Sequence, residues 1–283
     1  MPLSNSQMRD VQSVLHPYTN LMKHRDTGPM ILDHAKGIRV YDEQGRDYIE
    51  AMAGLWCTGL GWGVDELADV AAEQMRKMAF AHIFGGRSHE PAIALAEKLK
   101  EISPFPAGKV FFANSGSEAN DTQVKIAWYA ANARGQTAKK KIISRMKAYH
   151  GVTLVAASLT GLPNNHKSFD LPFDFVKFAD CPHYYRGAEG GESERDFSTR
   201  MAANLDALIQ REGPDTISSM IAEPVMGAGG VILPPEGYFD AIVKVLDRYD
   251  ISLIDDEVIT GFGRTGEWFG CSKYGFEPDS MTL

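Results

Sequence analysis

Apolar and polar positions follow two different rhythms along the chain. Residues 37–50 alternate with a period of two on either side of a Gln-Gly turn, which predicts a short antiparallel hairpin. From Leu67 onward, some stretches have helical spacing and others are short apolar runs. The helical stretches are 67–77, 91–102, 118–131 and 238–249, and the apolar runs are 109–113, 141–145, 216–222 and 251–254. This alternation is typical of the α/β class, with a mostly parallel sheet flanked by helices.

Four of these regions end in polar loops of unusual composition. The loops are Asn-Ser-Gly-Ser at 114–117, Tyr-His-Gly at 149–151, Glu-Pro-Val at 223–225 and Asp-Asp-Glu at 255–257. Ligands of parallel α/β sheets bind at the carboxyl ends of the strands. We therefore expect the four loops to build one shared site.

Composition and charge exclude several classes of protein. The 283 residues are 44% hydrophobic with a formal net charge of −8, which argues against a nucleic-acid-binding or anionic-membrane surface. No apolar run approaches the length of a membrane span, and the N-terminus lacks the layout of a signal peptide. The three cysteines are far apart, which predicts neither disulfides nor a metal site and fits a cytoplasmic location.

The segment from Asn114 to Asn120 joins a predicted strand to a predicted helix. Gly116 allows a tight turn, and the hydroxyls of Ser115 and Ser117 lie beside the amides that open the helix. This arrangement suits a phosphate group, although a serine at this position also serves as a plain helix cap. No Gly-Lys-Ser/Thr sequence follows, which excludes a Walker A loop.

Two other strand ends carry ionisable and aromatic side chains. Asp255, Asp256 and Glu257 end an apolar strand, and a carboxylate in a buried site needs a cationic or protonated partner. Tyr149 and His150 follow another strand, where the tyrosine ring can stack on a planar ligand. Taken alone, the same residues also fit solvated strand caps, a core tyrosine and a structural histidine.

Five segments, taken in order, resemble the fold-type I pyridoxal-phosphate enzymes, and specifically the class III aminotransferases of the omega-transaminase group. They are Gly-Leu-Trp-Cys at 54–57, Asn-Ser-Gly-Ser-Glu-Ala-Asn at 114–120, Tyr-His-Gly at 149–151, Ala-Glu-Pro-Val at 222–225 and Asp-Asp-Glu-Val-Ile-Thr-Gly-Phe-Gly-Arg-Thr-Gly at 255–266. The resemblance covers nearly the whole chain. It implies a large cofactor-binding domain over 56–283 and the N-terminal part of a small α+β domain over 1–55.

The resemblance implies a binding role in the pyridoxal 5'-phosphate site for each matching residue. Ser115, Gly116 and Ser117 are expected to form the phosphate cup. Tyr149 is expected to stack on one face of the pyridine ring, with Val258 on the other face.

Acidic and imidazole groups complete the expected site. Asp256 is expected to face the pyridine nitrogen and keep it protonated, so that the ring accepts electrons from the substrate. Asp256 and Tyr149 are thus the expected catalytic residues, and His150 and Glu223 are expected to contact the cofactor, with Asp255 in a lesser role.

The resemblance also implies a substrate pocket lined by aromatic side chains from early segments. Trp56, Tyr18 and Phe84 fit such positions, although each also fits a hydrophobic core. Phe84 is expected to reach the site of a partner subunit, because the family's sites form across the interface of a homodimer or a dimer of dimers.

One expected element is absent from the sequence. The resemblance implies a Schiff-base lysine beyond the Asp-Glu-Val strand, and no lysine here lies in that context; we interpret Lys273 as a surface residue. We therefore expect that the sequence is a fragment of a longer enzyme and that this chain alone is inactive.

The resemblance implies amino-group transfer from a primary amine or omega-amino acid to a keto acid, with pyruvate as the first acceptor to consider. The two half-reactions on one cofactor imply ping-pong kinetics. Two alternatives stay open: another class III enzyme, such as an aminomutase, racemase or decarboxylase, and a lysine-free, non-catalytic binding protein. A dinucleotide-dependent oxidoreductase fits worse, because Ser-Gly-Ser is not a Gly-x-Gly-x-x-Gly turn.

Overall fold

The computed structural model describes residues 2–283, which form two compact units. An N-terminal unit ends at Arg87, and a C-terminal unit begins at Ser88. The sequence predicts a domain boundary between residues 55 and 56, whereas the N-terminal unit of the structure also includes residues 56–87. The assignment of 1–55 and 56–283 to two domains of a longer enzyme stays a prediction.

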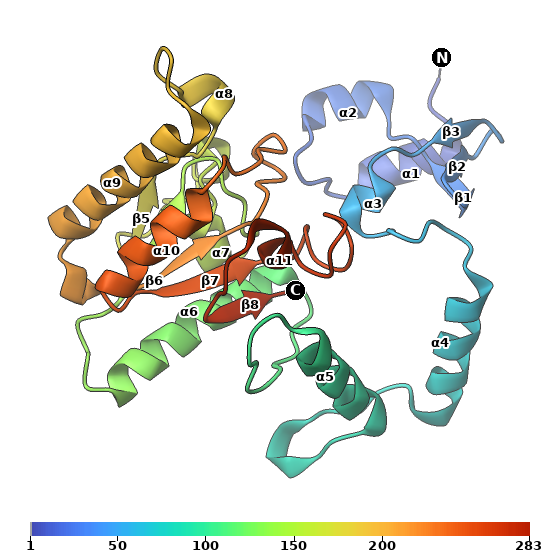
Figure 1. Ribbon diagram of the computed structural model, residues 1–283. Coiled ribbons are helices and arrows are strands. Elements are labelled where there is room, and N and C mark those ends of the chain that lie inside the picture. The colour runs from blue at the N-terminus through green and yellow to red at the C-terminus, as the bar shows by residue number, and fades with distance from the viewer. Residues whose placement is uncertain (1) are drawn as a thin grey trace. The chain divides into compact units, whose positions relative to one another are not determined.

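The N-terminal unit contains a three-stranded antiparallel sheet in the order β1-β2-β3, together with short helices (Figure 1). Its elements are α1 (Asn5–Ser13), α2 (Leu21–Thr27), β1 (Leu32–Lys36), β2 (Arg39–Asp42), β3 (Asp47–Ile49), α3 (Ala53–Trp56), α4 (Asp65–Met78) and a 3₁₀ turn (Phe84–Gly86). Arg39 pairs with Ile49 and Tyr41 with Asp47, which confirms the hairpin predicted for residues 37–50. The helix predicted for 67–77 is confirmed as α4.

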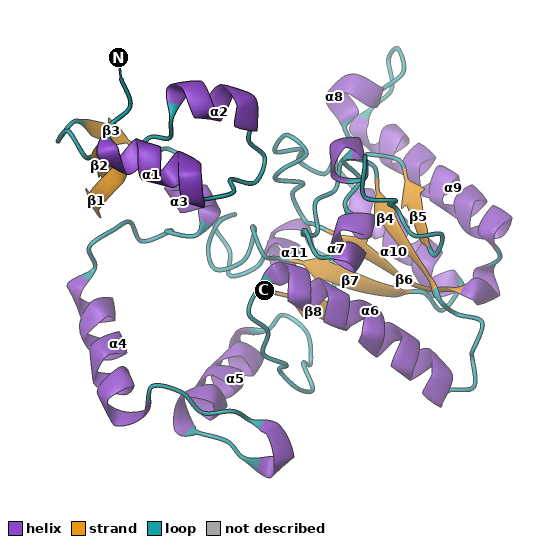
Figure 2. Cartoon of the chain, turned by 180° about the vertical axis from the view of Figure 1, so that it is seen from behind, coloured by secondary structure: helices purple, strands orange, loops and turns teal. Residues whose placement is uncertain are grey.

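The C-terminal unit contains a five-stranded parallel sheet with helices on both faces (Figure 2). Its helices are α5 (Glu90–Ile102), α6 (Gly116–Ala133), α7 (Leu154–Leu159), α8 (Tyr184–Gly187), α9 (Glu194–Glu212), α10 (Tyr238–Arg248) and α11 (Gly270–Tyr274), with 3₁₀ turns at Pro163–Asn165 and Pro214–Thr216. Its strands are β4 (Lys141–Arg145), β5 (Val176–Ala179), β6 (Ile217–Ala222), β7 (Ser252–Asp256) and β8 (Ser280–Thr282). The α/β class predicted from the sequence is confirmed.

The strand order β5-β4-β6-β7-β8 places β6 and β7 in the interior of this sheet. The register pairs Ala222 of β6 with Asp255 of β7, so the two strands end side by side. Because all neighbouring pairs are parallel, the loops after β4, β6 and β7 leave the sheet at the same edge.

Two apolar layers hold the sheet between its helices. One joins α9 and α10 to the first face of the sheet and includes Phe197, Ile209, Ile242, Met220 and Leu253. The other joins α6 and α7 to the opposite face and includes Val124, Leu159, Ile142, Ile221 and Ile254. Successive strand residues such as Leu253 and Ile254 are therefore both buried, which explains the continuous apolar runs of the sequence.

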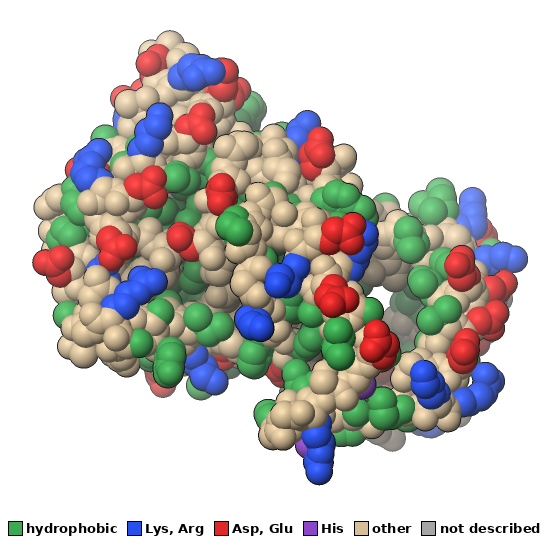
Figure 3. All heavy atoms as spheres, turned by 60° about the horizontal axis from the view of Figure 1, so that its bottom comes forward, with side chains coloured by type: hydrophobic (Ala, Val, Ile, Leu, Met, Phe, Trp, Pro, Cys, Tyr) green, Lys and Arg blue, Asp and Glu red, His purple; other side chains and the backbone are tan. Residues whose placement is uncertain are grey.

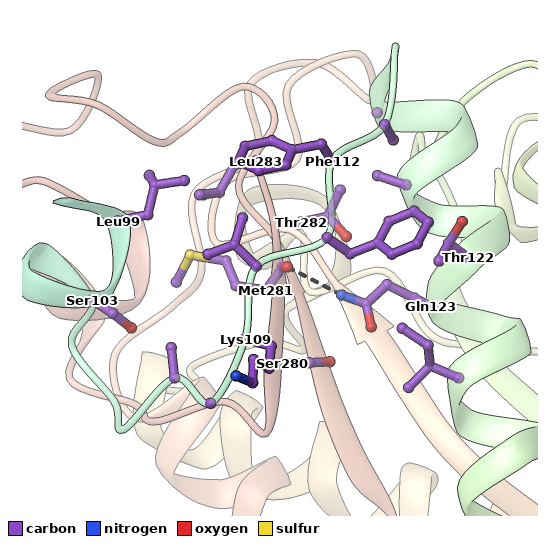
Figure 4. Close-up of a pocket in the computed structure, with 18 of the residues that line it drawn as sticks. Leu99, Ser103, Lys109, Phe112, Thr122, Gln123, Ser280, Met281, Thr282 and Leu283 are labelled. Carbon is purple, nitrogen blue, oxygen red and sulfur yellow. Dashed lines mark hydrogen bonds between the residues drawn. The ribbon is translucent and has the colours of Figure 1, made fainter. Parts of the chain in front are cut away.

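The strand predicted for residues 109–113 is wrong. These residues are extended but pair with no strand among the described residues, and Phe111 is 70% exposed. A mostly apolar cavity of about 600 Å³ lies beside this segment, between it and β8 (Figure 4). Leu99 of α5 and Gln123 of α6 also line this cavity. An apolar run becomes a strand only where a neighbouring strand completes its hydrogen bonds. Here a cavity, and not a strand, lies beside the run.

The surface agrees with the excess of acidic over basic residues in the sequence. Acidic and basic side chains are interspersed over the face shown in Figure 3, without a continuous basic patch on that face. None of the described helices combines the length and apolar character needed to cross a membrane. Cys57, Cys181 and Cys271 are all free, as their spacing predicts.

Candidate functional site

The loops after β4, β6 and β7 and the start of α6 meet around a small cavity of about 160 Å³. This cavity is lined by Gly116, Ser117, Asn120, Tyr149, His150, Gly151, Glu223, Asp256, Val258 and Ile259. Residues from all four polar segments of the sequence are therefore brought together, as the strand-end argument predicts.

The start of α6 supplies backbone amides to this cavity. Ser115 is the N-cap, and its Oγ accepts a hydrogen bond from the N–H of Glu118 at 3.2 Å. A β-carbon at Gly116 would lie 2.7 Å from Cγ2 of Val258, so a larger residue there would displace the Val258 side chain. The amides that open an 18-residue helix carry partial positive charge, which makes this end of α6 suitable for an anion.

The second part of the cavity wall is a close contact between Ser117 and the loop after β4. The N–H of Val152 donates a hydrogen bond to Ser117 Oγ at 3.0 Å, which leaves the hydroxyl proton of Ser117 available to a ligand. Gly151 has φ +132°, and a β-carbon there would lie 2.3 Å from Ser117 Oγ. This glycine is thus required both by its backbone conformation and by the proximity of α6.

Asp256 lines the cavity and is held in place by the side chains of Asn120 and His150. Its Oδ2 accepts a hydrogen bond from Asn120 Nδ2 at 2.8 Å and lies 2.7 Å from His150 Nδ1. Its Oδ1 accepts the N–H of Val258 at 3.2 Å. Asp256 is 4% exposed and the other two residues are almost fully buried, so the carboxylate has one fixed orientation.

Asn120 is a site residue to which the sequence argument assigned no role. Its Nδ2 also donates to the carbonyl of His150 at 2.8 Å, so one side chain ties together α6, the loop after β4 and the end of β7. An uncharged polar residue one turn after Ser117, on the inner face of the helix, was the available signal. Among the described residues, Asn120 Oδ1 and His150 Nε2 are buried without a hydrogen-bond partner.

Glu223 positions the loop that carries Tyr149. Its Oε1 accepts the N–H of Tyr149 at 3.0 Å, and its Oε2 accepts the N–H of Gly227 at 3.2 Å. Burial raises the pKa of Glu223 to about 7, against the opposing influence of His150 and Arg145. A carboxyl group that titrates near neutrality in a ligand-sized cavity is suited to proton transfer.

The neighbouring acid, Asp255, belongs to the opposite face of the sheet. It lies with Glu257 and Cys271, all three fully enclosed. Burial, together with the Glu257 carboxyl, raises the pKa of Asp255 well above its ordinary value. Asp256 lines the small cavity and Asp255 does not. The two successive aspartates have separate environments because side chains along a strand point alternately to opposite faces.

Not every predicted site residue lies at this cavity. Ser115 caps α6 and lines the larger cavity of Figure 4 instead. Tyr18, Trp56 and Phe84 belong to the N-terminal unit, where Tyr18 and Phe84 are exposed and Trp56 ends α3. Their role in a substrate pocket stays a prediction.

The fold and the cavity define an α/β protein with a ligand site at the carboxyl ends of its parallel strands. Comparison with known proteins identifies its family. The model of the family "Aminotransferase class-III" matches residues 21–283, and the chain belongs to this family. The resemblance stated from the sequence is thereby confirmed.

Relatives and solved structures agree with this membership. The chain is 52% identical over 271 residues to "Gamma aminobutyrate transaminase 1, mitochondrial" of Solanum lycopersicum, covering 95% of this chain and 53% of that protein. It is 51% identical over 274 residues to "Probable gamma-aminobutyrate transaminase 2, mitochondrial" of Oryza sativa subsp. indica, covering 96% and 55%. The crystal structure of the omega transaminase from Pseudomonas jessenii in complex with PMP superposes with a TM-score of 0.97 at 53% identity, covering 98% and 61%. The chain thus spans about half the length of the curated relatives it matches.

Class III aminotransferases use pyridoxal phosphate, and the small cavity fits this cofactor. The glycine-lined start of α6 offers amides and the Ser117 hydroxyl to a phosphate, and the fixed carboxylate of Asp256 offers an acceptor to a protonated ring nitrogen. The buried, unpartnered Nε2 of His150 and Oδ1 of Asn120 show that polar capacity remains beside that carboxylate.

Proposed function

We propose that the chain is the cofactor-binding part of an aminotransferase that moves an amino group from a primary amine or omega-amino acid to a keto acid. Gamma-aminobutyrate is the first donor to consider, because relatives about half identical to the chain are described as gamma-aminobutyrate transaminases. Pyruvate is the first acceptor to consider. The observation that carries the proposal is the fixed Asp256 carboxylate in a cavity that is also lined by a helix N-terminus.

Bound pyridoxal phosphate supplies an electron sink for the negative charge that develops on the substrate carbon. Asp256 would hold the proton of the ring nitrogen, since a carboxylate favours the protonated form of a neighbouring base. His150 and Asn120 keep this carboxylate in place. Ser117 and the amides of α6 would bind the phosphate, and Tyr149 and Val258 would lie against the faces of the ring.

An amine-exchange assay tests the proposal with the protein expressed from its own gene. The protein is incubated with pyridoxal phosphate, gamma-aminobutyrate and pyruvate, and the formation of alanine is followed. We expect alanine to form only when donor and acceptor are both present, with ping-pong kinetics. Release of carbon dioxide, or movement of the amino group to another carbon of the donor without a keto acid, would instead favour a class III decarboxylase or aminomutase. Cofactor binding without any turnover would favour a non-catalytic binding protein.

Substitution of Asp256 tests the role of the carboxylate directly. Asp256→Asn keeps the shape of the side chain but removes its charge, so we expect bound cofactor to be retained in part while turnover falls by about 100-fold or more. Asp240→Asn, on the exposed surface of α10, is the matched control and should leave both quantities unchanged. Turnover near the wild-type value in Asp256→Asn would contradict the assignment.

Assembly and location extend the same proposal. We expect a homodimer or a dimer of dimers, in which Phe84 contributes to the site of the partner copy, and analytical ultracentrifugation of the purified protein measures this. A cytoplasmic location is the expectation from the sequence, whereas the relatives described above are named as mitochondrial. Fractionation of the source cells distinguishes these locations.

A further inference from the structure

A cluster of two histidines and one aspartate lies in the N-terminal unit, and none of the three residues lines the small cavity. Asp10 is on α1, His24 is on α2, and His16 is in the loop that joins the two helices. The capping box of Ser4 and Gln7 fixes the start of α1, and the side chain of Asn20 accepts the N–H of Lys23 at the start of α2. Local hydrogen bonds thus define both helices that carry the cluster.

The ring nitrogens of both histidines converge on one carboxylate oxygen. Nε2 of His16 lies 2.8 Å from Asp10 Oδ1, and Nε2 of His24 lies 3.2 Å from the same atom. The ring centroids are 4.5 Å apart with a 50° angle between the planes, so the rings are not stacked and both edges point inward. Potential ligand atoms of all three residues lie within 4.8 Å of one another.

These distances match the needs of a small divalent metal ion. Zn²⁺ binds imidazole nitrogen and carboxylate oxygen at about 2.0–2.2 Å, which puts the ligand atoms of a tetrahedral site about 3.3 Å apart. The observed separations of 2.8 and 3.2 Å require only a slight opening of the cluster. Two histidines and one carboxylate form a common three-ligand set for zinc that leaves a fourth position to water.

The exposure of the three side chains also suits a metal ion. The side chain of His24 is 9% exposed, whereas those of Asp10 and His16 are 18% and 29% exposed. One ligand is therefore anchored inside the unit, and the other two leave a path for an ion from solvent.

We propose that Asp10, His16 and His24 form a binding site for a divalent transition-metal ion of the zinc type. The ion joins α1, α2 and the loop between them, and this loop also carries Tyr18. Its role is structural, because no residue of the small cavity takes part. The sequence predicts no metal, since ligands six and eight positions apart match no recognised zinc spacing and meet only after both helices have folded.

Zinc content of the full chain tests the proposal. The protein is prepared without a histidine tag, treated with chelator, loaded with Zn²⁺, exchanged into metal-free buffer and analysed by mass spectrometry for bound metal. We expect one zinc per chain, with affinity reduced by at least about 100-fold in Asp10→Asn, His16→Gln and His24→Gln, because loss of a ligand exceeds the cost of losing an outer-shell partner. His34→Gln is the matched control, since the exposed His34 lies in the same unit but pairs with Asp33 and stacks on Tyr41.

A second measurement uses the unmodified chain and does not depend on the folding of the variants. Co²⁺ bound in a tetrahedral nitrogen and oxygen site gives an intense visible absorption, and we expect Zn²⁺ to remove it at a stoichiometry of one. Zinc binding that persists in all three variants, or a cobalt spectrum no stronger than that of the free ion, would overturn the proposal.

Discussion

Gly151 shows how one residue without a side chain allows the loop after β4 to lie close to α6 at the small cavity. The chain leaves β4, passes Tyr149 and His150, and reverses at Gly151 directly against Ser117 of α6. Any side chain at this position would push the loop away from the helix and separate Ser117 from the N–H of Val152. This wall of the small cavity therefore depends on the absence of a β-carbon at Gly151.

This leads to a prediction with an internal control. Gly151→Ala combines a strained φ of +132° with a contact of 2.3 Å, so we expect a loss of about 2–3 kcal/mol in the free energy of unfolding and weaker binding of pyridoxal phosphate. Gly135→Ala also has a positive φ, +75°, but meets open space, and should cost about 1 kcal/mol and leave cofactor binding unchanged. Urea unfolding and a fluorescence titration measure the two effects. Equal effects of both substitutions would show that close packing at Gly151 is unimportant.

Asn120 allows a similar test of the Asp256 carboxylate. Asn120→Ala removes one hydrogen bond to Asp256 Oδ2, and we expect affinity for pyridoxal phosphate to fall by about 3- to 10-fold, which corresponds to about 0.5–1.5 kcal/mol. Asn132→Ala, at an exposed position of the same helix where the side chain pairs with Lys140, should leave affinity unchanged. Cofactor affinity that is the same in both variants would refute a positioning role for Asn120.

At the scale of elements, burial at the end of β6 raises the pKa of the Glu223 carboxyl, so the folded state holds its proton to a higher pH than the unfolded chain does. The pKa of Glu223 is raised from 4.5 to about 7, while the unfolded chain ionises near the ordinary value. Stability from this group is therefore fully present below pH 4.5 and is lost as the pH rises through 7. The loss is about 3 kcal/mol, because each unit of pKa difference corresponds to about 1.4 kcal/mol.

The corresponding experiment compares pH profiles of stability. In Glu223→Gln, we expect a free energy of unfolding that decreases less between pH 4.5 and 7 than in the wild type, as measured by urea denaturation at each pH. Glu277→Gln, at an exposed position, should reproduce the wild-type profile. A profile for Glu223→Gln that parallels the wild type would show that Glu223 titrates normally in the folded protein.

Elements differ in how well the sequence predicts them. β4, β6 and β7 follow from continuous apolar runs because both faces of the sheet are covered by helices. Residues 109–113 have the same apolar pattern but lack a neighbouring strand, and pairing between distant segments is not visible in a local pattern.

The residues of the site also divide into those predictable from a local sequence pattern and those that depend on packing between distant segments. Strand ends could be predicted to meet, because parallel strands end at one edge, and Ser117, Tyr149, Glu223 and Asp256 do meet there. Asn120 lies on a helix, and its contact with Asp256 depends on how α6 packs on the sheet. The zinc-type cluster depends in the same way on the packing of two helices.

At the scale of the whole molecule, the division into two units suggests where the chain is open to proteases. Residues 83–88, at the boundary, are all exposed. Within the described part of the chain, the Arg87 side chain forms a side-chain hydrogen bond with His82 alone. Exposed connections of this kind are preferred sites of proteolysis.

We therefore expect brief digestion with trypsin to cut first after Arg87 and to give two fragments, identified by mass spectrometry. Arg87→Gln removes this site and should slow the first cleavage, whereas Arg248→Gln, within α10, should not. Initial cleavage inside the C-terminal unit would contradict the boundary.

The three-residue strand β8 has a consequence for how the molecule behaves in concentrated solution. It forms one edge of the five-stranded sheet. The unpaired N–H and C=O groups of an edge strand can pair with strands of other molecules. Gln123 Nε2 donates a hydrogen bond to the carbonyl of Met281 at 3.1 Å and occupies one of the acceptors that an incoming strand would need. Resistance to self-association at this edge thus depends in part on the amide of a glutamine that does not line the small cavity.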